Sequence, residues 1–253
     1  MPTEEIIIRL FCMVDDVIGS VKKRSDAHLH DSEIVTIGLL FSLKGGRYRA
    51  FYRWLHANYR TLFPKLPDVT RLLRLLKSRA YYADEFLDDP SFFTVADTYG
   101  IELIHPRREG RSPAQVGKKG KSNGRWIVGI KLGWLINREG KVVTWQWDTA
   151  NVSDREFRDM PLAYNGETIA LCDLGFREAD APHENMLFCE KGTWNERFAV
   201  ETDFSWICEL FHSKKIYHRK RPYIDARLGY MTALMNCLLD ITDTKRSLTQ
   251  FVI

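Results

Sequence analysis

Apolar residues in the first third of the chain recur every three or four positions, which is the period of an α-helix. The pattern predicts four or five helices between Glu4 and about Leu87. The first covers about residues 4–21. The second contains "SEIVTIGLLFSLK", with Asp31 expected as its N-cap, and it stops at Gly45 and Gly46, because glycine favours helix termination.

The third and fourth predicted helices carry aromatic and basic residues. The third contains "YRAFYRWLHANYRTLF" and ends at Pro64 and Pro67. Asp68 then caps the fourth, "VTRLLRLLKSR", whose leucines share one face. Another face of this helix carries Arg71, Arg74 and Lys77. Such a basic face fits a helical DNA-binding module, and it also fits the solvated side of a small bundle.

After about residue 90 the pattern changes to that of β-strands. Five segments are predicted as strands: "SFFTVADTYG", "RWIVGIKLGWLIN", "KVVTWQWDTA", "ETIALCDLGF" and "ENMLFCEKG". A helix is predicted in "SDREFRDMPLAY", with Ser153 or Asp154 as N-cap, and a long amphipathic helix begins near Trp194. The order β-β-β-α-β-α-β-α is compatible with a meander of the first three strands and right-handed crossovers between the later ones. We therefore expect an α/β domain over residues 91–253.

Composition and charge narrow the class of protein. A chain of 253 residues with 45% hydrophobic and 28% charged residues can build one large domain, or a main domain with a smaller one. The net charge of +4 only weakly favours an acidic partner such as nucleic acid. The five cysteines show no C-x-x-C spacing, which suits a reducing cytosol. The acidic start "MPTEEIIIRLFCMVDD" fits neither a secretory signal nor a membrane span, so we expect a soluble, cytoplasmic protein.

Three acidic residues stand where the pattern argues against an exposed charge: Asp97 and Asp173 near the ends of predicted strands, and Glu201 near the apolar stripe of a helix. If the first and fourth strands are neighbours, the two aspartates converge at one end of the sheet and meet Glu201. Two carboxylates about 4 Å apart repel by roughly 4 kcal/mol at an effective dielectric of about 20, so the cluster favours bound divalent cations. Oxygen ligands select Mg²⁺ or Mn²⁺, and a pair of such ions suits displacement at a phosphodiester. Each acid alone also fits an N-cap, a turn or an ion pair.

The segments around these acids resemble the motifs of DDE-type insertion-sequence transposases, which join an RNase H-like catalytic core to a helical N-terminal region. "VADTYG" carries the first Asp, "CDLGF" the second and "RFAVETDFSWI" the Glu, and "TANVSDREF" lies between the aspartates. The resemblance covers almost the whole chain. It implies an RNase H-like mixed sheet flanked by helices, preceded by a DNA-binding region over residues 1–90. The similar C-terminal run "ARLGYMTALMNCLLD" implies a helix packed on the catalytic core.

The resemblance also implies a role for each acid. Asp97 would bridge two Mg²⁺ (or Mn²⁺) ions, while Asp173 and Glu201 would each hold one. The protein would cut double-stranded DNA at the terminal inverted repeats of its element and join the 3′-OH to target DNA, as a homodimer or a larger assembly. Arg197, one helical turn before Glu201, is expected to contact a phosphate or stabilise the transition state; the alternative is an ion pair with Glu201.

Two basic segments are predicted to line a DNA channel. "RREGRSPAQVGKKGKSNGR" follows the strand of Asp97 and is predicted as a mobile basic loop beside the active site, or else a solvated surface hairpin. Its expected phosphate contacts are Arg107, Arg108, Arg111, Lys118, Lys119, Lys121 and Arg125. "HSKKIYHRKRPY" adds Lys214, Lys215 and Arg219. Lys131 in "VGIKLGW" matches a lysine of similar transposases and is expected either to face the site or to be structural.

A metal site in "DAHLHD" and catalysis by cysteine have less support in the sequence. "DAHLHD" places two histidines between two aspartates, but the turn before a helix explains it and nothing completes a tetrahedral metal site. Nucleophilic catalysis by cysteine is disfavoured, because apolar surroundings raise the thiol pKa. Two alternatives to the transposase remain: an RNase H-like nuclease without strand transfer, and a catalytically silent protein that binds DNA through residues 1–90 and the basic segments.

Overall fold

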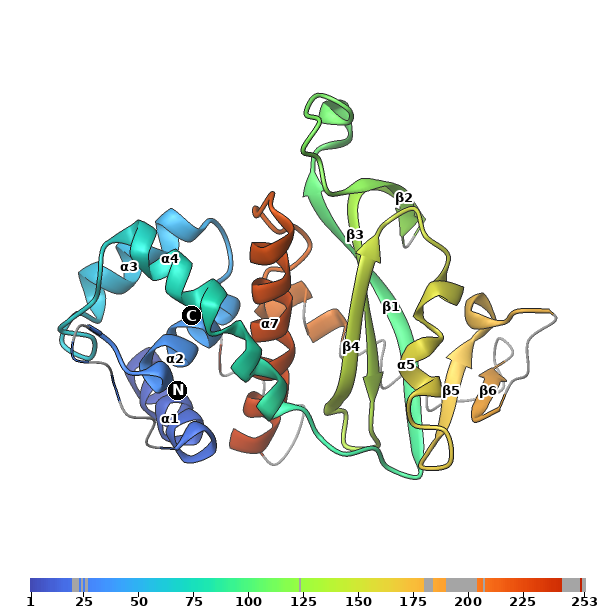
Figure 1. Ribbon diagram of the computed structural model, residues 1–253, viewed down its shortest axis with the longest axis horizontal. Helices are drawn as coiled ribbons and strands as arrows, with labels where there is room; N and C mark the ends of the chain where they lie inside the picture. Colours follow the sequence, from blue (N-terminus) through green and yellow to red (C-terminus); the bar gives the residue numbers. More distant parts are fainter. Residues whose placement is uncertain are drawn as a thin grey trace. The chain divides into compact units, whose positions relative to one another are not determined.

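The computed structural model describes most of the chain, and its secondary structure is shown in Figure 1. The described residues are 1–19, 23, 25, 27–122, 124–179, 184–189, 204–206, 208–242 and 251. The chain divides into two compact units. The helical unit comprises residues 1–86, 209–213 and 220–253, and the sheet unit comprises residues 87–208 and 214–219.

The helical unit has long helices at its centre. Its elements are α1 (Thr3–Ile18), α2 (Asp31–Lys44), α3 (Tyr48–Asn58), α4 (Val69–Ser78), the 3₁₀ helix η1 (Ala80–Phe86) and α7 (Arg221–Ile241). Both α2 and α7 are buried on almost all sides, which is typical of core helices. They pack against one another, and α7 also packs against η1. Among the described residues, none of the helices has both the length and the apolar character needed to cross a bilayer.

The ends of these helices test the predicted caps. Asp68 is confirmed as the N-cap of α4, since its carboxylate accepts the amides of Thr70 and Arg71 at 2.9 and 3.0 Å. The prediction of Asp31 as N-cap of α2 is wrong by one residue, because His30 is the N-cap. The Asp31 carboxylate instead accepts a hydrogen bond of 2.7 Å from Nε of Arg79, the C-cap residue of α4. This ion pair holds the start of α2 against the end of α4.

The C-terminal helix was expected to pack on the catalytic core, and that packing stays a prediction. It is α7, and it belongs to the helical unit. Tyr230 of α7 lies against Gly38 of α2, and its hydroxyl donates to the carbonyl of Leu76 at 2.9 Å. A helix with apolar residues on all sides needs partners all round, and α2, α4 and η1 are among them.

The sheet unit contains six strands: β1 (Phe93–Ile104), β2 (Lys118–Ser122), β3 (Arg125–Ile136), β4 (Val142–Thr149), β5 (Ile169–Asp173) and β6 (Met186–Cys189). β1, β3 and β4 are consecutive antiparallel neighbours, which confirms the predicted meander. β5 runs parallel to β1 and β6 runs parallel to β5, so the first and fourth predicted strands are neighbours. β2 was not predicted as a strand; it pairs with the start of β3.

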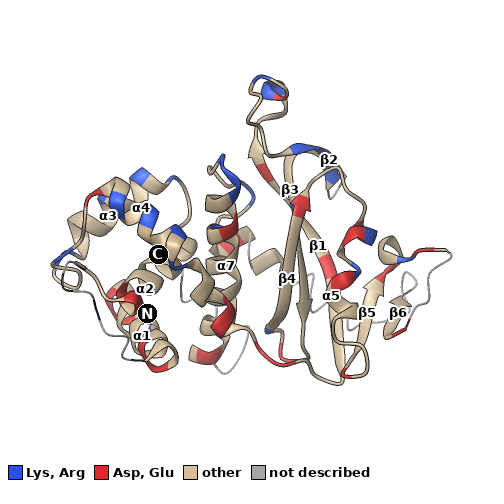
Figure 2. Ribbon diagram, viewed as in Figure 1, with Lys and Arg blue, Asp and Glu red and all other residues tan. Residues whose placement is uncertain are grey.

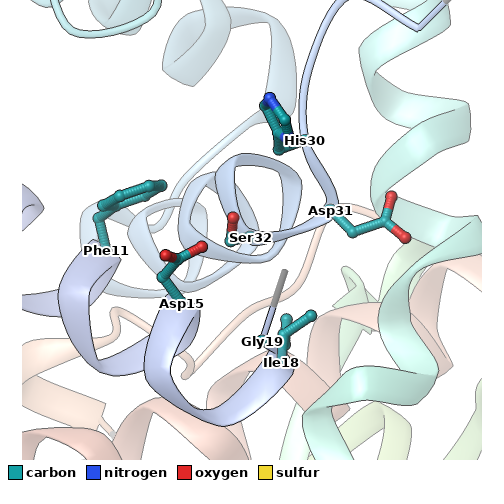
Figure 3. Close-up of a pocket in the computed structure, with 7 residues that line it drawn as sticks. All are labelled: Phe11, Asp15, Ile18, Gly19, His30, Asp31 and Ser32. Carbon is teal, nitrogen blue, oxygen red and sulfur yellow. The ribbon is translucent and has the colours of Figure 1, made fainter. Parts of the chain in front are cut away.

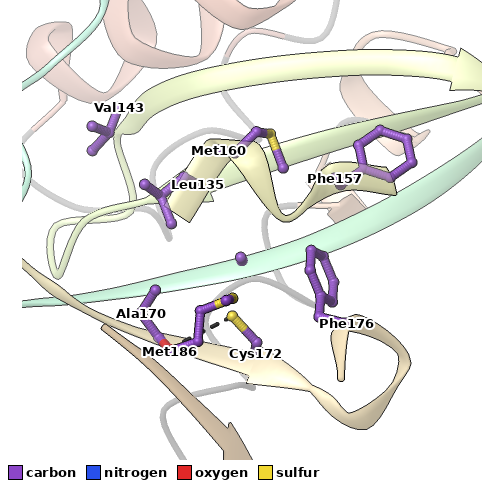
Figure 4. Close-up of a cluster of buried hydrophobic side chains, with 9 residues drawn as sticks. Leu135, Val143, Phe157, Met160, Ala170, Cys172, Phe176 and Met186 are labelled. Carbon is purple, nitrogen blue, oxygen red and sulfur yellow. Dashed lines mark hydrogen bonds between the residues drawn. The ribbon is translucent and has the colours of Figure 1, made fainter. Parts of the chain in front are cut away.

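One face of the sheet is covered by three short helices, η3 (Asp154–Phe157), α5 (Asp159–Leu162) and η4 (Leu174–Phe176). Figure 4 shows Phe157, Met160 and Phe176 converging on side chains of the strands in the core of this face. Ser153 is the N-cap of η3, as one of the two predicted alternatives. The single helix predicted in "SDREFRDMPLAY" is divided into η3 and α5, because Pro161 has no amide to continue a helix that began at residue 154.

Candidate active site

Asp97 and Asp173 occupy neighbouring positions on adjacent strands. Ala96 of β1 and Cys172 of β5 form the last pair of the parallel ladder, and the two aspartates follow one residue later. Neighbouring strands lie about 4.8 Å apart, and successive side chains point to opposite faces. Ala96 and Cys172 belong to the hydrophobic core on the face that η3, α5 and η4 cover. The carboxylates of Asp97 and Asp173, one residue later, therefore project from the opposite face. The predicted convergence of the two acids agrees with this register, but the expectation that both end a strand holds only for Asp173, since Asp97 lies inside β1.

Each carboxylate is held by the amide of the residue that follows it. Asp97 Oδ1 accepts the Thr98 amide at 2.7 Å, and Asp173 Oδ1 accepts the Leu174 amide at 2.6 Å. Both aspartates are partly buried. Asp173 is also the N-cap of η4. Asp173 therefore caps a helix and also lies next to the position of Asp97.

Two carboxylates at neighbouring positions fit a hard divalent cation, since oxygen donors suit Mg²⁺ and Mn²⁺ and a cation offsets the repulsion between them. Within the part of the chain that the structure describes, His, Cys, Asp and Glu do not form a group of three that could hold a metal ion. The predicted third ligand, Glu201, and the predicted phosphate contact, Arg197, lie outside the described residues. Both stay predictions.

Aromatic side chains occupy the same face as Asp97. Trp134 of β3 is the cross-strand partner of Asp97, and its ring is 5.6 Å from that of Phe204. The Phe204 ring is also stacked 5.6 Å from that of Tyr99. Burial raises the pKa of the Tyr99 phenol, and a hydrogen bond of 2.7 Å with the Cys208 thiol adds to the rise. Phe204 and Cys208, which follow the predicted glutamate in the sequence, thus lie on the Asp97 side of the sheet.

Lys131 lies on the opposite face of the sheet. It stands three residues before Trp134 in β3, so alternation turns it away from Asp97. Its ammonium donates to the Val152 carbonyl and to Asp154 Oδ1, each at 2.8 Å. Of the two alternatives for Lys131, facing the carboxylates is therefore wrong and the structural role holds, because a lysine in an apolar strand needs an anionic partner and Asp154 supplies it. Contact of Lys131 with DNA remains a prediction.

Asp154 was predicted only as a possible helix cap, and its role as a partner of side chains on β1 and β3 was missed. Besides Lys131, it accepts a hydrogen bond of 2.7 Å from the Thr98 hydroxyl. Its partners are remote in sequence, so no local spacing reveals them. The one available signal was the lysine within an otherwise apolar strand, which implies a carboxylate nearby.

The first basic segment is partly ordered as a strand. Residues 118–122 form β2, and only the preceding part, which begins with the 3₁₀ helix η2 (Pro106–Arg108), is a loop. The prediction of a mobile loop across the whole segment is wrong, and the hairpin alternative holds for β2 and β3. Figure 2 shows Lys and Arg along β2 and in the loop before it. The exposed basic residues here are Arg107, Arg108, Arg111, Lys118, Lys119, Lys121 and Arg125.

The second basic segment lies beside the same strand, β1. The Glu102 amide donates to the Lys214 carbonyl at 3.1 Å, and the Ile216 amide donates to the Glu102 carbonyl at 2.9 Å. Lys215 forms an ion pair with the Glu102 side chain, while Lys214 and Arg219 are exposed. Two basic segments that are far apart in sequence therefore adjoin the carboxyl-terminal half of β1.

The helical unit contains a pocket between the end of α1 and the start of α2 (Figure 3). Asp15, His30 and Asp31 line it. Asp31 is already bound to Arg79 and to the Tyr82 hydroxyl, at 2.7 and 3.2 Å. In this pocket, His30 of "DAHLHD" is the N-cap of α2, and Asp31 ties the first turn of α2 to Arg79.

The Cys172 thiol is expected to resist alkylation in the folded protein. Burial raises its pKa from an ordinary value of 9.0 to about 12, which lowers the thiolate fraction about 1,000-fold at pH 8. Cys12 is exposed and should react readily. Mass spectrometry after brief iodoacetamide treatment at pH 8 should find label on Cys12 and reach Cys172 only in denaturant. Equal labelling of both cysteines under native conditions would contradict the burial of this thiol.

The described part of the site consists of two carboxylates at the junction of β1 and β5, with basic segments beside the far half of β1. This arrangement can bind a hard cation and, near it, a polyanion. No family model matches the chain, and no curated protein or solved structure matches it either.

Proposed function

We propose that this protein is a DDE-type DNA transposase that cuts and joins the ends of an insertion sequence with Mg²⁺ or Mn²⁺. The observation that carries the proposal is the position of Asp97 and Asp173, side by side on adjacent parallel strands and on one face of the sheet. A divalent cation would offset the repulsion between two carboxylates so placed.

The strand arrangement supports an RNase H-like core. Three antiparallel strands, β4, β3 and β1, are continued by the parallel strands β5 and β6. The first carboxylate lies on the central strand β1 and the second at the end of its parallel neighbour β5. This is the mixed sheet flanked by helices that the resemblance implies, with β2 as an added hairpin.

The position of Phe204 supports the third ligand. Its ring stacks on those of Tyr99 and Trp134, on the same face as Asp97. Glu201 precedes Phe204 by three residues, so the covalent chain alone keeps their Cα atoms within about 11 Å. That reach is compatible with Glu201 as the partner of the two aspartates.

In the proposed reaction the chain would bind the ions and the DNA. Asp97, Asp173 and Glu201 would hold the ions, which when bound activate the attacking oxygen and neutralise charge at the phosphate. The amides of Thr98 and Leu174 fix the orientation of the two carboxylates. The exposed basic residues of both segments would neutralise phosphates of the element ends and the target. Because two ends must be joined, we expect a homodimer or a larger assembly on DNA.

The proposal is tested with DNA that carries the flanks of the protein's own reading frame, incubated with the purified protein and Mg²⁺ or Mn²⁺. Cuts that expose 3′-OH ends at the element boundary, followed by joined products, are expected on a sequencing gel. Cuts without joining would favour a nuclease of the same fold. Binding without metal-dependent cuts would favour a catalytically silent DNA-binding protein.

The salt dependence of DNA binding should change when the β2 lysines are removed. Lys118 and Lys121 are exposed and have no partner role in the sheet beyond their backbone pairs. The double variant Lys118→Ala, Lys121→Ala should weaken binding and lower the slope of log K against log salt by about 2, because each lost phosphate contact removes about 0.9. Fluorescence anisotropy from 50 to 300 mM salt measures the slope. Arg138→Ala, an exposed change in the β3–β4 turn, should leave the slope unaltered; an unaltered slope in the double variant would remove β2 from the DNA surface.

A further inference from the structure

We infer that Asp154 is a positioning residue that holds both metal-binding carboxylates in register from the opposite face of the sheet; this inference rests on the proposed function. Asp154 begins η3, and its hydroxyl donor, Thr98, is the strand neighbour of Asp97. Alternation places the Thr98 side chain on the face opposite to that of Asp97. Asp154 therefore acts through the backbone and not as a ligand.

The first link runs through Thr98. Its hydroxyl donates to Asp154 Oδ1 at 2.7 Å, and its amide donates to Asp97 Oδ1 at 2.7 Å. Both bonds belong to one residue, so the position of the Thr98 side chain and the direction of its amide are coupled. Holding the hydroxyl fixes the amide that orients Asp97.

The second link runs through Gly175. A Cβ built on Gly175 would lie 2.9 Å from Asp154 Oδ2, so the Asp154 carboxylate rests directly against this backbone. Gly175 follows Leu174, whose amide donates to Asp173 Oδ1 at 2.6 Å. Asp154 therefore contacts the chain just after each of the two carboxylates.

Lys131 holds Asp154 in this position. The ion pair is 2.8 Å long, and the side chains of Lys131 and Asp154 are 13% and 31% exposed. The ammonium also donates to the Val152 carbonyl at 2.8 Å, which ties it to the residues that lead into η3. Four segments, β1, β3, η3 and η4, thus meet at one carboxylate. Residues that orient metal ligands from behind commonly change metal affinity or activity by about 10- to 100-fold when mutated.

The decisive comparison is Thr98→Val against Thr98→Ser. Valine keeps the branched shape and removes the hydroxyl donor, while serine keeps the donor. Asp154→Ala is the second variant, and Glu156→Gln on the exposed side of η3 is the control. Three quantities are measured: the Mn²⁺ concentration for half-maximal cleavage, Mn²⁺ binding by calorimetry, and hydrogen exchange in the peptides that contain the Thr98 and Leu174 amides.

Thr98→Val and Asp154→Ala should each require about 10- to 100-fold more Mn²⁺ and recover much of the rate at saturation. The amide of residue 98 should exchange faster in both variants, and that of Leu174 faster in Asp154→Ala, with DNA affinity retained. Thr98→Ser and Glu156→Gln should resemble the wild type. Equal Mn²⁺ dependence and exchange in Thr98→Val and Thr98→Ser would overturn the inference while leaving the proposed function intact. Wild-type protein that neither binds Mn²⁺ nor cuts DNA would overturn the proposed function and the inference with it.

Discussion

Replacing Asp97 or Asp173 by Asn should lower metal-dependent DNA cleavage by at least about 1,000-fold, which corresponds to about 4 kcal/mol of activation free energy. Asparagine has the shape of aspartate, and its Oδ1 can still accept the amides of Thr98 and Leu174, so the local backbone should persist. The loss would therefore come from the missing charge. Single-turnover cleavage of the flanking DNA in Mn²⁺ measures it.

Two further readouts separate loss of metal binding from loss of fold. DNA affinity should stay within about twofold of the wild-type value, because the basic segments are untouched. Without metal, the variants should be as stable as the wild type or slightly more stable, since one of two neighbouring negative charges is gone. Added Mn²⁺ should raise the melting temperature of the wild type but not of the variants.

The matched control for this experiment is Asp159→Asn, an exposed aspartate of α5 in the same unit. It should cut DNA at the wild-type rate. Wild-type rates in Asp97→Asn, or an equal loss in Asp159→Asn, would refute the assignment of the carboxylate pair as the metal site.

Gly38→Ala should destabilise the protein by about 2–3 kcal/mol, although alanine ordinarily favours a helix by about 1 kcal/mol over glycine. A Cβ at this position of α2 would lie 2.5 to 2.7 Å from three ring atoms of Tyr230. The ring cannot easily withdraw, because it is 2% exposed and its hydroxyl is bound to the Leu76 carbonyl. Urea denaturation followed by circular dichroism measures the change.

The same substitution in a Tyr230→Ala background supplies the control. There the space beside residue 38 is empty, so the helical preference of alanine should dominate and Gly38→Ala should stabilise by up to about 1 kcal/mol. A change of sign between the two backgrounds identifies the steric contact as the cause. Destabilisation of equal size in both backgrounds would show that the close approach of α2 and α7 is not responsible.

The helices of residues 1–86 could largely be predicted from the sequence, because helix caps and hydrophobic periodicity are local signals. Asp68 and Gly45 mark helix ends where the pattern places them. The alternation of β1, β3 and β4 was also local. The adjacency of β1 and β5, on which the candidate site depends, was only a condition that the order of elements allowed.

The parts that were missed depend on contacts between distant residues. β2 has the polar sequence "KKGKS", and its pairing relies on Gly120, where a Cβ would lie 1.7 Å from the Ala150 carbonyl oxygen. Lys131 and Asp154 meet only after the sheet has formed. The packing of α7 on α2 and η1 was not predicted, because a helix with apolar residues on every side does not reveal which surfaces cover it.

The helix α7 comes late in the chain but belongs to the unit of the N-terminal helices, and this order affects folding during synthesis. The buried surface of α2 is completed by a helix that begins at Arg221, long after the first 86 residues have left the ribosome. At about 5–20 residues per second, the N-terminal helices wait on the order of ten seconds for it. A fragment of residues 1–90 would expose that surface permanently, so a truncated copy of the gene should yield an aggregation-prone product and not a free DNA-binding module.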